Sequence, residues 1–247
     1  MKPLEDCRAK IFEHERVALQ FSGGKDSMTT LFYLRPFWDN ITVYWTNPGD
    51  ALPETTELMA KVKDLVPHFV EITGNVLEWK GMNGLPSDVY VDTLTPFGEL
   101  KTGTQAPFYI TPTHLCCRAN MHKPMLDRMV ADGVTLIIRG EKSHDEHRNH
   151  LLHDGFIDAN SVEYMFPIYD ETNESVMEYL NANCPEFIHG VYATGAGGLL
   201  DCLTCTGWWD EYKGTYISDR YPDIAKQVAE VKKVIATETI ELLNLVC

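Results

Sequence analysis

The residues best suited to chemistry near the start of the chain form a short loop, Ser22-Gly-Gly-Lys-Asp-Ser27. Its two glycines let the backbone approach an anion without a Cβ in the way. Backbone N–H groups, the serine hydroxyls and the Lys25 ammonium could bind phosphate oxygens, and Asp26 could hold a divalent metal on that anion. The alternative is an ordinary Gly-Gly turn. The composition of the loop favours a phosphate site, with Lys25 and Asp26 as its catalytic candidates.

Four of the seven cysteines form a second reactive group, the two tight pairs Cys116-Cys117 and Cys202-Leu-Thr-Cys205. A Cys-x-x-Cys segment presents two thiolates to one metal from a single turn, which is the usual half of a zinc or iron–sulfur site. Adjacent cysteines on a helix diverge by about 100°, which suits a wide cluster better than a single zinc ion. The residues alone leave zinc, a cluster, redox thiols and buried structural thiols open.

Strands and helices alternate around these residues. Val17 to Phe21 has the composition of a strand and Met28 to Leu34 that of a helix, so the glycine loop follows a strand and faces a helix N-terminus. Further strands are predicted at 41–46, 69–72 and 134–138, and further helices at 57–66, 115–129, 174–180 and 222–243. This alternation indicates a parallel sheet that binds ligands at the carboxyl ends of its strands.

Composition limits the class of protein. The chain has 247 residues, 44 % of them hydrophobic, so it can bury a sizeable core. Its formal net charge of −15 disfavours nucleic-acid binding unless a local basic patch or a partner brings the nucleic acid in. No apolar run approaches the length of a membrane span, and the N-terminus does not resemble a signal peptide. We therefore expect a cytoplasmic protein without membrane contact.

Several of these segments resemble one family. Ser22–Ser27, directly after a strand, is similar to the PP-loop of the N-type ATP pyrophosphatases, the adenine nucleotide alpha hydrolase-like superfamily. The cysteine pattern resembles the 4Fe–4S ligands of adenylyl-sulfate-type reductases in the phosphoadenosine phosphosulfate (PAPS) reductase family. Asn47–Thr55, Gly140–Arg148 and Pro167–Asp170 resemble other segments of that family, so the likeness spans roughly residues 17–206.

This resemblance implies a Rossmann-like three-layer α/β/α fold with a mainly parallel sheet and a C-terminal helical extension, divided into 1–206 and 207–247. It implies a 4Fe–4S cluster held by Cys116, Cys117, Cys202 and Cys205, and Mg²⁺ bound with ATP. The implied nucleotide-binding residues are Ser22, Gly23, Gly24, Lys25, Asp26, Ser27, Gly49 and Asp50. The implied basic residues for phosphate or substrate are Lys123, Arg139, Lys142 and Arg148.

Two departures separate the activities found in this family. The PP-loop is intact, as in relatives that cleave ATP between the α and β phosphates. The tail ending at Cys247 lacks the glycine and histidine that accompany the catalytic thiol of sulfonucleotide reductases. We therefore expect an enzyme, an ATP pyrophosphatase that adenylates an acceptor for sulfur transfer. The alternatives are an adenylyl-sulfate (APS) or PAPS reductase that forms sulfite, and an iron–sulfur subunit without activity of its own.

The expected partners follow from this chemistry. They are an adenine nucleotide (ATP, or APS or PAPS), a sulfur donor protein or thiol reductant, and a second copy of the chain as a homodimer.

A separate feature is a histidine at every third residue, at His144, His147, His150 and His153. On a helix such a series drifts around the axis, so a solvated polar segment is favoured over a metal site.

Overall fold

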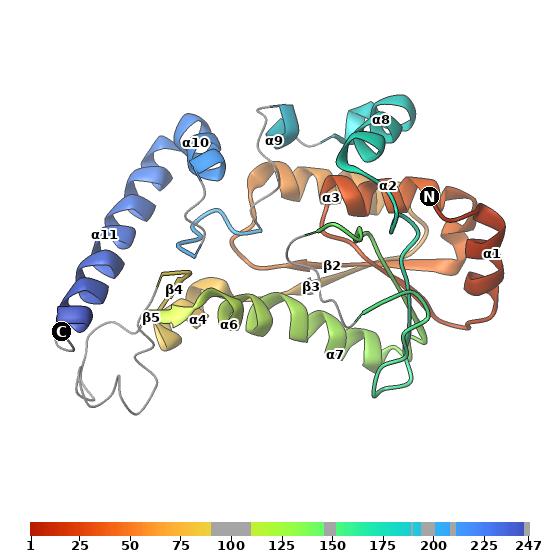
Figure 1. Cartoon of the computed structure of the whole chain (residues 1–247), viewed down its shortest axis with the longest axis horizontal. Coiled ribbons are helices and arrows are strands. Elements are labelled where there is room, and N and C mark those ends of the chain that lie inside the picture. Colours follow the sequence, from red (N-terminus) through yellow and green to blue (C-terminus); the bar gives the residue numbers. More distant parts are fainter. Residues whose placement is uncertain (90–109, 146–151, 189, 194–200, 208–210, 245–247) are drawn as a thin grey trace. The chain divides into compact units, whose positions relative to one another are not determined.

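A computed structural model describes residues 1–89, 110–145, 152–188, 190–193, 201–207 and 211–244 (Figure 1). The chain divides into two compact units that alternate along the sequence. Unit 1 consists of Met1–Thr46, Pro53–Ile72 and Met125–Ala193, and unit 2 of Asn47–Leu52, Thr73–Pro124 and Thr194–Cys247. The division into 1–206 and 207–247 stays a prediction.

Unit 1 is built on a five-stranded sheet in the order β3-β2-β1-β6-β7. Its strands are β1 (Val17–Gln20), β2 (Ile41–Asn47), β3 (Phe69–Thr73), β6 (Leu136–Arg139) and β7 (Glu163–Met165). Strand β1 runs parallel to both β2 and β6, and β6 runs parallel to β7. The predicted mainly parallel α/β fold is therefore confirmed. The short strand β7 was not predicted from the sequence.

Helices cover both faces of this sheet. On one face, Ala18, Tyr44 and Ile137 pack in a buried cluster that includes Met129 of α7. Figure 1 shows α7 on one side of the sheet and α2, α3 and α8 on the other, which confirms the predicted three layers. The helices of unit 1 are α1 (Leu4–Phe12), α2 (Lys25–Tyr33), α3 (Pro53–Leu65), α7 (Lys123–Ala131), α8 (Asn173–Asn183) and α9 (Gly190–Ala193), with 3₁₀ turns at Arg35–Asn40 and Pro185–Phe187.

Helix starts follow local capping chemistry. Helix α3 begins at Pro53, because proline has no N–H to lose in the first turn. Helix α8 begins after Thr172, whose hydroxyl accepts from the Ser175 N–H while the Ser175 hydroxyl accepts from the Thr172 N–H. Helix α2 begins at Lys25, earlier than the predicted Met28, so the charged residues of the glycine loop form its first turn.

Unit 2 contains the four candidate ligand cysteines and a set of mostly short elements. These are α4 (Val76–Asn83), β4 (Leu85–Ser87), β5 (Ile110–Pro112), α6 (Thr113–Cys117), a π-helical turn at Arg118–His122, α10 (Glu211–Arg220) and α11 (Pro222–Asn244). Strands β4 and β5 pair in parallel. Helices α10 and α11 make the C-terminal segment helical, as predicted. Within the part of the chain described, no helix is long and apolar enough to cross a membrane.

Candidate functional site

The glycine loop turns sharply where β1 ends. Gly23 has φ +78°, a conformation that favours glycine; a Cβ there would lie 2.7 Å from the Met59 Cε atom, which ends a flexible side chain and can move aside. Helix α2 then starts at Lys25, with Gly24 as an N-cap that offers no side-chain acceptor. The Lys25 N–H instead donates to the Tyr192 hydroxyl at 2.8 Å. A polar oxygen from α9 thus lies at the positive end of the α2 dipole.

The two loop serines hold the loop in shape. The Ser22 and Ser27 hydroxyl oxygens are 3.1 Å apart, and the Ser22 hydroxyl also accepts from the Gly24 N–H at 3.3 Å. The Ser27 hydroxyl donates to the Gly24 carbonyl at 3.0 Å, and Ser27 is buried. These bonds run within six consecutive residues, so the loop conformation is set locally before any ligand arrives.

Asp26 lies between two lysines. Its Oδ2 atom is 2.6 Å from the Lys25 ammonium, and its Oδ1 atom is 2.6 Å from the Lys142 ammonium. Lys142 also pairs with Asp145 at 3.0 Å, and only 3 % of its side chain is exposed. Burial by itself would lower the pKa of Lys142, but the hydrogen bonds and charges of Asp26 and Asp145 outweigh it and raise that pKa. Lys142 is therefore a buried cation that fixes the Asp26 carboxylate.

Gly140 makes this pairing possible. It follows β6, and a Cβ at this position would lie 2.7 Å from both the carbonyl carbon and the carbonyl oxygen of Asp26. Backbone atoms cannot move aside as the end of a flexible side chain can, so a larger residue would push the segment away from α2. The missing Cβ lets the Gly140 backbone approach α2 and brings Lys142 within reach of Asp26.

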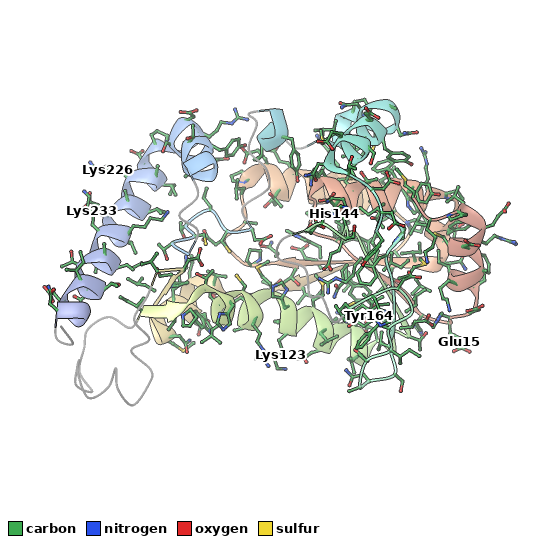
Figure 2. All side chains as sticks on the ribbon, in the orientation of Figure 1. Glu15, Lys123, His144, Tyr164, Lys226 and Lys233 are labelled. Carbon is green, nitrogen blue, oxygen red and sulfur yellow. The ribbon has the colours of Figure 1, made fainter. Side chains whose placement is uncertain are left out.

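The other predicted basic residues have different surroundings. Arg139 forms an ion pair with Glu141, and Lys123 is an exposed residue at the start of α7 in unit 2 (Figure 2). Arg148 lies outside the described residues. Lys142 is thus the predicted basic residue that the described structure joins to the glycine loop by a direct ion pair.

The histidine series shows no shared contact among its described members. His144 and His153 are both exposed. The His153 ring packs edge-on against Phe156. His147 and His150 lie outside the described residues, so a solvated polar segment stays the favoured interpretation.

Gly49 and Asp50, predicted to bind nucleotide, belong to unit 2 together with the cysteines. The Asp50 carboxylate accepts from the Thr204 N–H at 3.0 Å and from the Thr204 hydroxyl at 2.5 Å. Thr204 lies between the two cysteines of the Cys-x-x-Cys segment. The contacts of Asp50 therefore join it to the cysteine site, and its nucleotide-binding role stays a prediction.

The four predicted ligand cysteines come together in unit 2. Cys116, Cys117, Cys202 and Cys205 line one cavity with a volume of about 20 Å³, alongside Val76, Lys80, Pro86, Thr113 and Met121. All four are free thiols. Cys116 and Cys202 are buried with Val76, and Trp79 and Cys205 pack against them. Two segments that are far apart in sequence thus bring four sulfur atoms to one largely apolar wall.

Burial raises the pKa of three of these thiols and so favours their protonated forms. Burial is the largest cause that raises the pKa of Cys116 to about 11, against the partial opposing effect of Lys80. Burial, reinforced by the charge of Asp201, raises the pKa of Cys117 to about 12. The pKa of Cys202 is raised as well, with burial again the main cause. A metal that takes these sulfurs as thiolates must displace their protons.

A π-helical turn follows the adjacent cysteines. Buried Asn120 lies in this turn and donates from its side chain to the Cys116 carbonyl at 3.0 Å. The Asn120 side-chain oxygen accepts from the Asn75 N–H at 3.2 Å, next to the start of α4. The sequence predicted one continuous helix here and missed the turn. The available signal was the asparagine three residues after the two adjacent cysteines, because its amide can hydrogen-bond to nearby backbone groups. Such turns often occur at functional sites.

The donor chemistry suits an iron–sulfur cluster, since four cysteine thiolates are its usual ligands. Among the described residues, no group of three or more His, Cys, Asp or Glu side chains is arranged to hold a single metal ion. The four thiols are therefore gathered at one place, and as thiolates they are the residues that would hold such a cluster.

Taken together, the parallel sheet, the glycine loop after β1 and the helix that follows define a Rossmann-like α/β protein. The chain belongs to the PAPS reductase family: the model of the phosphoadenosine phosphosulfate reductase domain matches residues 16–207. A comparison with curated proteins found no match.

Two solved structures resemble the fold. One is the phosphoadenylyl-sulfate (PAPS) reductase of Candida auris in a phosphate complex, with a TM-score of 0.54 and 11 % identity over 79 % of this chain and 85 % of that one. The other is the U34-tRNA thiolase NcsA of Methanococcus maripaludis with its 4Fe–4S cluster, with a TM-score of 0.46 and 11 % identity over 94 % of this chain and 78 % of that one. At this identity the reductase supports the fold alone.

Proposed function

We propose that this protein is an ATP pyrophosphatase of the PAPS reductase family, which adenylates an acceptor for sulfur transfer. The observation that carries the proposal is the intact loop Ser22–Ser27 at the N-terminus of α2, with two lysines held on Asp26. Family relatives that do not split a nucleoside triphosphate usually have an altered loop, whereas this loop keeps every residue suited to the phosphates.

In the proposed reaction an acceptor oxygen attacks the α-phosphorus of ATP, and pyrophosphate leaves. The N–H groups at the start of α2 bind the phosphates, where the helix dipole favours negative charge. The Lys25 ammonium turns from Asp26 to the pyrophosphate and stabilises the charge that develops as the α–β bond breaks. The Lys25 N–H, which donates to Tyr192 in this structure, becomes available to a phosphate oxygen when that hydroxyl moves.

Asp26 is the expected ligand of the Mg²⁺ that accompanies ATP. When Lys25 turns to the phosphates, the Oδ2 atom of Asp26 is released while Oδ1 stays with Lys142. Buried Lys142 then acts through Asp26, because it fixes the direction of the carboxylate. Arg139, Lys123 and Arg148 remain proposed contacts of the acceptor or its phosphates.

The cysteine site is the proposed place of a 4Fe–4S cluster, held by Cys116, Cys117, Cys202 and Cys205. When bound, such a cluster supplies electrons or a site for sulfur. A sulfur donor protein or a thiol reductant would deliver the sulfur that displaces AMP from the adenylated acceptor.

We place the enzyme in the cytoplasm and propose a homodimer as its assembly. A partner would bring any nucleic-acid acceptor to the enzyme.

Family membership favours a second candidate function, a sulfonucleotide reductase that releases sulfite from APS or PAPS. This reaction needs a thiolate that attacks the sulfur of the bound nucleotide. Cys247 would be that thiol, and it lies outside the described residues. The intact loop Ser22–Ser27 leaves this candidate second.

The test is a substrate comparison with protein purified and reconstituted without oxygen. The exchange requires the adenylated acceptor, so the assay contains a panel of candidate acceptors with ATP and Mg²⁺. We expect exchange of labelled pyrophosphate into ATP and no thiol-dependent sulfite from APS or PAPS. Lys25→Ala should lower the exchange rate by about 10²- to 10³-fold, and Cys247→Ser should leave it unchanged. Sulfite release by the wild type that disappears in Cys247→Ser would replace the pyrophosphatase with the reductase. If neither reaction occurs with the holo protein, the subunit without its own activity becomes the better interpretation.

A further inference from the structure

The loop between β2 and α3 joins two parts of unit 2. The Gly74 N–H donates to the Asn47 carbonyl at 2.7 Å, which ties the loop to the segment that begins α4. The Leu203 N–H donates to the Asp50 carbonyl at 2.6 Å, which ties the loop to the Cys-x-x-Cys turn. The loop therefore contacts the residues on both sides of the cysteine cavity.

The Asp50 side chain adds to the backbone bond. Its Oδ2 atom accepts from the Thr204 N–H at 3.0 Å and from the Thr204 hydroxyl at 2.5 Å, and only 8 % of the side chain is exposed. Both residues between Cys202 and Cys205 thus direct their N–H groups to Asp50. A buried carboxylate with two donors from one residue fixes that residue firmly.

Lys80 of α4 completes the arrangement. Its ammonium donates to the Thr204 carbonyl at 2.8 Å and to the Thr204 hydroxyl at 3.1 Å, and it lies 3.9 Å from the Asp50 carboxylate. The N–H, the carbonyl and the hydroxyl of Thr204 are therefore all held by one acid–base pair. Lys80 also lines the cavity beside the four thiols, so the pair and the sulfurs belong to one site.

We propose that Asp50 is a positioning residue of the cysteine site, which holds the Cys202–Cys205 turn in the conformation that directs both sulfurs toward the bound cluster. Outer contacts of this kind orient ligands and support metal affinity, and their loss typically costs 10- to 100-fold. The inference rests on the cluster part of the proposed function. It gives Asp50 a role that does not depend on nucleotide.

The first experiment uses the full chain without metal and follows hydrogen exchange of single amides. In Asp50→Ala the Thr204 amide should exchange at least about tenfold faster than in the wild type, because its acceptor is gone. The Leu203 amide should change less, since its acceptor is the backbone carbonyl of residue 50. Asp50→Asn keeps one acceptor oxygen and should restore part of the protection. Asp219→Ala, an exposed acid on α10, is the matched control.

The second experiment measures the cluster directly. After anaerobic reconstitution, a chelator should extract iron about tenfold faster from Asp50→Ala than from wild type, and Thr204→Val should show a smaller change in the same direction. Unchanged exchange of the Thr204 amide in Asp50→Ala and Asp50→Asn would overturn the inference. An Asp50→Ala variant that loses iron no faster than the wild type would overturn it as well. A wild type that takes up no iron would remove the proposed cluster, while the exchange experiment would still decide whether Asp50 fixes the turn.

Discussion

The glycine loop of unit 1 and the cysteine cavity of unit 2 are built by opposite means. The loop is held by its own serine hydroxyls and by ion pairs, so its binding groups are fixed without a ligand. The cavity gathers four thiols from two distant segments on an apolar wall, and burial raises the pKa of Cys116, Cys117 and Cys202. The loop is held mostly by local bonds, whereas the cavity depends on contacts between distant segments. The two sites should therefore respond to different changes.

The largest expected effect is a variant that loses the cluster but keeps the nucleotide affinity of the glycine loop. Cys202→Ser with Cys205→Ser removes two of four ligands, so iron and sulfide should fall to background after anaerobic reconstitution. Nucleotide affinity should stay within about twofold, because the loop is held by local bonds. Cys184→Ser, another buried free thiol, should retain full iron. Equal iron in the double variant and the wild type would remove the assignment of these cysteines.

The reverse experiment changes the loop and leaves the cluster. Asp26→Asn or Lys25→Ala should lower the rate of pyrophosphate exchange by about 10²- to 10³-fold, the usual effect of removing one group that stabilises developing charge. Iron content should match that of the wild type. Full exchange activity in both variants would show that the loop does not bind the reacting phosphates. Loss of iron in either variant would show that the two sites are not separable.

A smaller effect should follow from the buried lysine that supports the loop. Lys142→Met removes a cation shared by Asp26 and Asp145 and should lower the free energy of unfolding of the metal-free protein by about 1–3 kcal/mol. Lys233→Met, on the exposed side of α11, breaks a solvent-exposed pair with Glu230 and should cost less than about 0.5 kcal/mol (Figure 2). Urea denaturation of both variants measures the difference. If Lys142→Met and Lys233→Met lower the free energy of unfolding equally, the buried ion pairs of Lys142 do not stabilise the protein more than an exposed pair does.

The smallest effect is a pH dependence that belongs to the cysteine site. Cys116 and Cys117 have folded pKa values of about 11 and 12, above the ordinary 9.0, because burial disfavours the thiolate. Their protonated forms therefore favour folding fully below pH 9, and this contribution is lost as pH rises toward 11. Each of these two thiols should contribute a loss of at most about 1.4 kcal/mol per pH unit over this range, measured by urea denaturation of the metal-free protein. The double change of both cysteines to alanine should flatten that decline; an unaltered slope would contradict it.

Local patterns predicted much of this molecule. The run from Val17 to Leu34 alone indicates a strand, a loop and a helix, because apolar composition and two glycines act over a few residues. The spacing of the two cysteine pairs indicates one shared site, and the structure brings the four side chains to one cavity. Strand β7, with three residues, is too short to leave a pattern. The π-helical turn depends on Asn120 reaching Asn75, a contact that no sequence period encodes.

Contacts between distant residues explain the rest. Lys142 was expected to line a phosphate site; the structure pairs it with Asp26 and Asp145, contacts that the sequence did not indicate, and its role toward phosphate stays a prediction. Asp50 was expected among the nucleotide ligands; its contacts with Thr204 were not expected, and its role toward nucleotide stays a prediction. A charged residue in a loop does not reveal from its neighbours which partner it will meet. Such roles follow only from the folded chain.

The pairing of Asp26 with Lys142 has a consequence for how the protein folds. The two residues are 116 positions apart, and β1 takes one of its two neighbours, β6, from the same distant segment. Contacts of such long sequence separation slow folding, because the chain must close a large loop before they form. A chain that ends before Leu136 would leave one edge of the apolar β1 unpaired. That edge would be open to pairing with other chains and so prone to aggregation.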